Sequence, residues 1–222
     1  SRYGLFKLVP LPGTKVEVDN IAQFLESSKW KVNMYQKELA SEEQLKKTVS
    51  PKVLHIATHG YFLKDIYDKD DKSFLGFEES NIKSNPLLQS GIMLAGASKA
   101  AKDTANTVAQ DGIFTAYEAS LLNLANTDLV VLSACETGLG QDINGQGVFG
   151  LQRAFYIAGA KNLIMSLWSV DDDATQLLMT AFYKEWSLNP THEFISKAFN
   201  KAQREVRLKY SHPYYWGAFV LL

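Results

Sequence analysis

Residues 129–133 read Leu-Val-Val-Leu-Ser, four aliphatic side chains in a row with no polar alternation. A strand with one face in water would alternate apolar and polar residues, so this run indicates a strand buried on both faces, as in a parallel sheet. Parallel strands need long crossover connections, usually helices, and helical patterns separate the apolar runs of this chain. The sequence therefore predicts an α/β fold whose parallel sheet is covered by helices on both faces.

The other elements are read from periodicity, since period 2 indicates strands and period 3.6 indicates helices. Further strands are predicted at residues 5–11, 30–35, 52–58, 92–94, 162–166 and 215–222. Helices are predicted from residue 14 through 25, after the capping sequence at 41–44, and at 115–124, 148–158, 173–185 and 191–207. The polar stretches 64–90 and 99–110 are predicted to be loops. Neither a repeat nor a linker divides the chain, so we expect one domain over residues 1–222.

Composition and charge exclude several classes of partner. The formal net charge is −1, so no global positive field attracts nucleic acid or an anionic membrane. No apolar run approaches the ~20 residues that span a bilayer. The single cysteine cannot form a disulfide within the chain, and we expect a reducing, cytoplasmic compartment. The chain begins Ser-Arg-Tyr rather than with Met, so we expect it to be excised from a longer protein.

Two predicted strands lead into reactive side chains. The run 52–58 is followed by His59 and Gly60, and the run 129–133 leads to Cys135. Functional groups gather at the carboxyl ends of parallel strands, so an imidazole and a thiol would meet there if these strands are neighbours. An imidazole can take the thiol proton and later protonate a leaving amine. This pattern predicts Cys135 as a nucleophile and His59 as its general base.

The same two strand ends offer backbone donors for an oxyanion. The N–H groups of Gly60 and Cys135 are expected to face a carbonyl oxygen that becomes negative in the transition state, and one such donor is typically worth ~3 kcal/mol. Spacing alone leaves structural alternatives open. Cys135 would also serve as a small buried apolar residue, and His59 as a turn cap.

Metal and cofactor chemistries fit less well, and neither a metal nor a cofactor is expected. His55 and His59 are four residues apart, but they lie in a strand pattern and lack the acid of a His-Glu-x-x-His zinc motif. The stretch Gly145-Gln-Gly-Val-Phe-Gly150 matches a dinucleotide fingerprint, with Asp171 about twenty residues further on. However, residues 134–144 separate these glycines from the strand, and the acid lies beyond the next strand. Close helix packing is therefore favoured over a dinucleotide site.

Several motifs occur in a fixed order along the chain. They are Leu11-Pro-Gly-Thr14, His55-Ile-Ala-Thr-His59-Gly60, Leu132-Ser-Ala-Cys135-Glu-Thr-Gly138, Gly147-Val-Phe-Gly-Leu-Gln-Arg-Ala-Phe155, Leu167-Trp-Ser-Val-Asp171-Asp172 and Tyr215-Trp-Gly-Ala-Phe219. This ordered set resembles the CHAT family, caspase-like domains found fused to tetratricopeptide repeats. The resemblance runs nearly the full length and implies a caspase-like fold, with a mainly parallel sheet of about six strands. One departure is Gln146, where many members have Glu.

The resemblance also implies an activity. His59 becomes the base and Cys135 the nucleophile of an endopeptidase, which cleaves a specific protein partner through a thioester acyl-enzyme. Asp172 aligns with the acid that the similar separase motif uses in its S1 pocket, where a carboxylate would favour a basic P1 residue, and Asp171 is the second candidate. These acids also suit a helix start through the macrodipole. An upstream tetratricopeptide or other sensor region is the implied regulator, and the alternative function is a catalytically silent interaction module.

Overall fold

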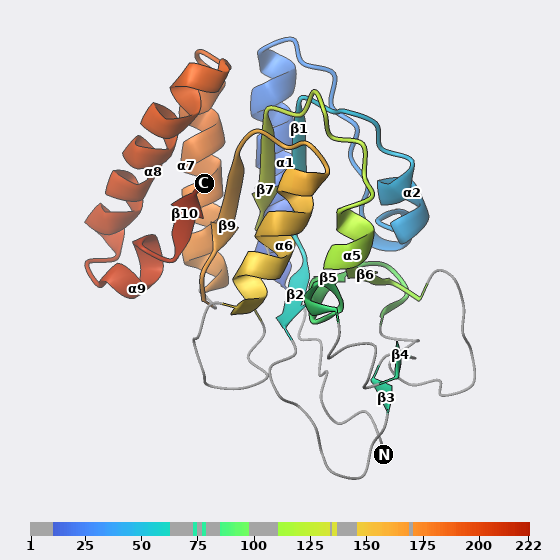
Figure 1. The fold of residues 1–222 in the computed structure, drawn as a ribbon. Helices are drawn as coiled ribbons and strands as arrows, with labels where there is room; N and C mark the ends of the chain where they lie inside the picture. The colour runs from blue at the N-terminus through green and yellow to red at the C-terminus, as the bar shows by residue number, and fades with distance from the viewer. Residues whose placement is uncertain are drawn as a thin grey trace.

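The computed structural model describes residues 11–62, 73–74, 77–78, 85–97, 111–133, 135–136, 146–168 and 171–222 (Figure 1). The strands are β1 Val53–Ile56, β2 His59–Phe62, β3 Ser73–Phe74, β4 Phe77–Glu78, β5 Ser90–Met93, β6 Ile113–Thr115, β7 Leu129–Leu132, β8 Cys135–Glu136, β9 Leu163–Ser166 and β10 Phe219–Leu221. The α-helices are α1 Pro12–Ser27, α2 Glu42–Lys46, α5 Ala116–Ala119, α6 Gln146–Ile157, α7 Asp172–Trp186, α8 Ile195–Lys209 and α9 Pro213–Trp216, and the 3₁₀ turns are η1 Lys37–Leu39, η2 Pro86–Leu88 and η3 His192–Phe194. Among the described helices, none is both long and apolar enough to cross a membrane.

The larger layer of the fold is a four-stranded sheet in the order β1-β7-β9-β10. The pairs β1-β7 and β7-β9 are parallel, and β10 is antiparallel to β9. Leu129 and Val131 of β7 pack into the cluster formed with α1, α7 and α8, whereas Val130 and Leu132 pack against α6. In Figure 1, α6 lies in front of this sheet and α1 lies behind it. The doubly buried strand predicted at 129–133 is thus confirmed, as is the α/β class.

A second sheet, in the order β6-β5-β2-β8, continues from the first. Strand β2 is antiparallel to β5 and parallel to β8, and β3 and β4 form a separate antiparallel pair. The sequence predicted one mainly parallel sheet of about six strands. The structure corrects this, because the ladders of β1 and β7 both stop before β2 and β8 begin, which leaves a mostly parallel four-stranded sheet and a second, mixed sheet.

One predicted strand is not formed, and the C-terminal strand is shorter than predicted. Residues 30–35 are not in a strand, and Trp30 instead packs edge-on against Trp186 of α7 with ring centroids 5.4 Å apart. The C-terminal strand begins only at Phe219, because Pro213 and the side chain of His212, which accepts from the Tyr214 N–H, start the short helix α9. The strand predicted at 5–11 and the loop at 99–110 lie outside the described residues, as does most of the loop at 64–90.

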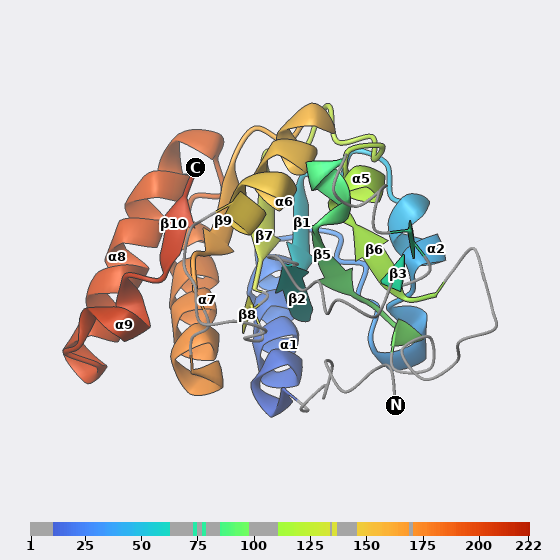
Figure 2. The same cartoon turned by 60° about the horizontal axis from the view of Figure 1, so that its bottom comes forward.

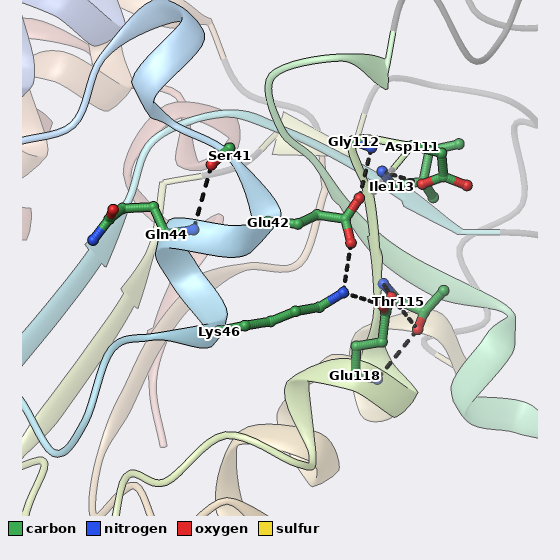
Figure 3. A network of polar contacts seen from close by, with 9 residues as sticks. All are labelled: Ser41, Glu42, Gln44, Lys46, Asp111, Gly112, Ile113, Thr115 and Glu118. Atoms are coloured by element: carbon green, nitrogen blue, oxygen red, sulfur yellow. Dashed lines mark hydrogen bonds and ion pairs between the residues drawn. The ribbon is translucent and has the colours of Figure 1, made fainter. Parts of the chain in front are cut away.

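A network of hydrogen bonds and ion pairs connects α2 to the second sheet and to α5 (Figure 3). Glu42 is 2% exposed, and its carboxylate accepts from the Gly112 N–H at 2.6 Å and from Lys46 Nζ at 2.7 Å. Lys46 also reaches Glu118 at 2.8 Å, and Glu118 completes a capping box with Thr115 at the start of α5. This buried carboxylate is therefore paired and hydrogen-bonded, as burial of a charge requires.

Candidate active site

The site is built where two parallel strands break at the same level. Beyond Ile56 of β1 and Leu132 of β7, which are in register, both ladders are interrupted. The Ser133 N–H donates to the Ile56 carbonyl at 2.9 Å, and the Thr58 hydroxyl donates to the Met93 carbonyl in β5. These two hydrogen bonds connect the residues at the break with neighbouring strands, and β2 and β8 begin directly after it.

The first residues of the new strands are His59 and Cys135. Strands β2 and β8, both labelled in Figure 2, are parallel. In their register His59 lies opposite Cys135 and Gly60 opposite Glu136. Paired strands lie about 4.8 Å apart, and residues in register share a face of the sheet. The sequence predicted that these two residues would be neighbours at strand ends. The structure makes them neighbours, but at the start of a second strand pair.

His59 is half-buried. It lies on the border of a cavity of about 980 Å³ that is lined mainly by α1, residues 30–37 and β1, and that also borders Thr58 and Met93. The predicted oxyanion donors, the N–H groups of Gly60 and Cys135, both lie in the β2-β8 pair. The structure therefore places His59, Gly60 and Cys135, the predicted base, donor residue and nucleophile, on two adjacent strands.

The two candidate S1 acids sit at the start of α7. Asp171 is its N-cap, and its Oδ1 accepts from the N–H groups of Asp173 and Ala174 at 3.1 Å each. Asp172 Oδ2 accepts from the Gly13 N–H at 2.6 Å. Helix α1 has neither a side-chain cap of its own nor an acid in its first turn, so Asp172 supplies the missing acceptor from a neighbouring helix. A substrate-binding role for Asp172 stays a prediction.

Among the glycines of the dinucleotide-like stretch, Gly150 has a packing role. Gly150 is inside α6, where an added Cβ would lie 2.5 Å from Ser90 Oγ, so its small size lets α6 approach β5. The close helix packing favoured for this glycine is thus present. Within the described ranges, there is no group of three or more His, Cys, Asp and Glu side chains that could hold a metal.

Sequence reasoning missed a buried chain of polar side chains near His59 and Cys135. Glu17 of α1 is 1% exposed; its Oε1 contacts His55 Nε2 at 2.8 Å and its Oε2 accepts from Ser133 Oγ at 3.0 Å. His55 Nδ1 contacts the Tyr183 hydroxyl at 3.1 Å, and burial, together with the Glu17 charge, raises the pKa of Tyr183 well above its usual value. The sequence did contain a signal for this chain, because Glu17 lies four residues before Ile21 and so places an acid on the apolar face of the predicted helix.

Comparison with known protein families shows to which family the chain belongs. The CHAT domain family matches residues 3–222. The chain belongs to the CHAT family. The resemblance read from the ordered motifs is therefore confirmed, and the CHAT domain is a caspase-like family, which agrees with the α/β architecture and its mostly parallel sheet.

Two curated relatives share part of this CHAT domain. Mouse tetratricopeptide repeat protein 28 is 34% identical over 107 residues, which is 47% of this chain and 4% of the relative. The human protein of the same name is 33% identical over 115 residues, or 51% of this chain and 4% of the relative. The chain therefore corresponds to a small part of the length of these relatives.

Proposed function

We propose that this CHAT domain is a cysteine endopeptidase that uses Cys135 as nucleophile and His59 as general base. The observation that carries the proposal is the parallel register of β2 and β8, which sets His59 opposite Cys135. Membership of a caspase-like family adds support. A thiol is a weak nucleophile until it loses its proton, and an adjacent imidazole is the group that can remove it.

The proposed reaction has two halves. His59 takes the thiol proton, the thiolate attacks the scissile carbonyl carbon, and the N–H groups of Gly60 and Cys135 stabilise the oxyanion. Collapse of this intermediate breaks the C–N bond, and His59 returns the proton to the leaving amine. Water, deprotonated by His59, then attacks the thioester and releases the acid product, and the proton returns to the Cys135 thiolate.

Covalent labelling tests the proposal. The CHAT domain is incubated with a peptidyl acyloxymethyl ketone carrying Arg or Lys at P1, and its intact mass is measured. Because Cys135 is the sole cysteine of the chain, one adduct per molecule reports on that residue. We expect one adduct in the wild type and none in Cys135→Ala. An unlabelled wild type, or equal labelling of the variant, would contradict the proposed function.

The proposed substrate is a protein, and the proposed regulator is a tetratricopeptide region elsewhere in the parent protein. Support comes from the two relatives, both named for tetratricopeptide repeats and far longer than the matched region. Recognition of a basic P1 residue by Asp172, with Asp171 beside it, is the corresponding proposal for specificity.

Replacement of Asp172 by asparagine separates the two roles of that carboxylate. Loss of the charge at the α1 N-terminus is expected to lower stability by about 1 kcal/mol, measured by chemical denaturation. If Asp172 also binds the substrate, kcat/KM for Arg and Lys at P1 falls more than kcat/KM for neutral residues. Asp173→Asn, which removes an exposed acid from the same helical turn, is the control. An unchanged P1 profile in Asp172→Asn would leave this residue with a structural role alone.

A further inference from the structure

A chain of buried polar side chains connects α7, β1, α1 and the end of β7 next to His59 and Cys135, the proposed catalytic dyad. It runs from Tyr183 on α7 through His55 on β1 to Glu17 on α1 and ends at Ser133, just beyond β7. Tyr183 is fully buried, Ser133 is 3% exposed, and the side chains of His55 and Glu17 are 9% and 1% exposed. A polar group costs free energy to bury unless it is hydrogen-bonded, so such a chain requires its members to be mutually satisfied.

The three contacts are compatible with a neutral imidazole, in the following assignment of protons. The Tyr183 O–H donates to His55 Nδ1, His55 Nε2–H donates to Glu17 Oε1, and the Ser133 O–H donates to Glu17 Oε2. In this assignment the imidazole is neutral, and a single negative charge sits on Glu17. Each carboxylate oxygen accepts one bond, so the charge holds both His55 and Ser133 in place.

The two oxygens of the Glu17 carboxylate contact residues that shortly precede His59 and Cys135 in the sequence. Ser133 lies two residues before Cys135, and its N–H also donates to the Ile56 carbonyl at 2.9 Å. His55 lies four residues before His59 and occupies β1, which is in register with β7. Glu17 therefore contacts β1 and the residue that follows β7, just before the break after which β2 and β8 begin.

We infer that Glu17 is a positioning residue for the proposed endopeptidase, which holds Ser133 and His55 so that Cys135 and His59 start their strands in register. This inference rests on the proposed function. Glu17 does not touch the substrate in this proposal and acts through the backbone. A small misplacement of the reacting groups can reduce a rate by about a hundredfold, so such a residue is expected to affect the rate of reaction more than binding.

The test measures inactivation of the full chain by the peptidyl ketone, with the maximal rate constant kinact separated from the binding constant KI. Glu17→Gln keeps the shape of the side chain but removes its charge. Its matched control is Glu42→Gln, which neutralises a second buried carboxylate, 2% exposed and bound to Gly112 and Lys46 away from His59 and Cys135. Ser133→Ala is the milder second variant, and it decides the outcome if Glu17→Gln does not fold.

We expect Glu17→Gln to lower kinact roughly 10- to 100-fold with little change in KI, and Ser133→Ala to act in the same direction. Glu42→Gln is expected to lose stability but keep its kinact. Unchanged kinact in the folded Glu17 and Ser133 variants, while His59→Ala is not labelled, would overturn this inference alone. A wild type that takes no label would overturn the proposed function, and the role of Glu17 with it.

Discussion

Replacement of His59 by alanine is expected to lower kcat/KM for peptide cleavage by roughly 10²- to 10⁴-fold at neutral pH. The imidazole has two tasks in the proposed reaction, to deprotonate the Cys135 thiol and to protonate the leaving amine. Without it, a thiol of ordinary pKa is only a few per cent ionised near pH 7, and the amine must leave without an acid. The measurement is the initial rate on a fluorogenic peptide with a basic P1 residue.

The control for this prediction is His192→Ala. His192 is exposed on η3 and its loss is expected to leave the rate unchanged. Equal rates for the wild type and His59→Ala would contradict the role of His59, whatever the effect of replacing Cys135.

Alanine at Gly159 is expected to destabilise the fold by on the order of 3 kcal/mol. Gly159 connects α6 to β9 with φ of +104°, a conformation that side chains rarely adopt. An added Cβ would also lie 2.9 Å from the Ala125 Cα and 3.0 Å from its nitrogen. Because both are backbone atoms, they cannot move aside as the end of a flexible side chain can.

Gly96 provides a matched comparison, since its φ is +106° but its nearest neighbour to an added Cβ is 3.6 Å away. Gly96→Ala therefore adds backbone strain without the clash, and it is expected to cost less. Denaturant unfolding of both variants measures the difference. Equal stabilities would show that the contact with Ala125 has no energetic importance.

The periodicity of apolar residues was sufficient to predict an element where burial alone determined its residues. The four consecutive aliphatic residues of β7 indicated a strand covered on both sides, and the spacing of Ile21 and Leu25 marked the buried face of α1. The proximity of His59 and Cys135 could also be predicted, because parallel strands place their carboxyl ends at one edge.

Other features depend on partners that are distant in sequence. The break after Ile56 is held by Ser133 and Met93, which lie far along the chain, so local sequence does not reveal it. The contact between Asp172 and Gly13 joins two helices 159 positions apart. The contacts of Glu17 likewise form only when α1, β1 and the end of β7 come together, and its residue type alone suggests a solvent-exposed position.

The central claim is that His59 and Cys135 act as a pair, and the pH dependence of Cys135 alkylation tests it most directly. The sole cysteine reacts with iodoacetamide as its thiolate, so the rate follows ionisation of that one group. We predict a midpoint well below the ~8.5 of a free thiol in the wild type, and a return toward that value in His59→Ala. A midpoint at or above ~8.5 that is the same in both proteins would contradict the claim.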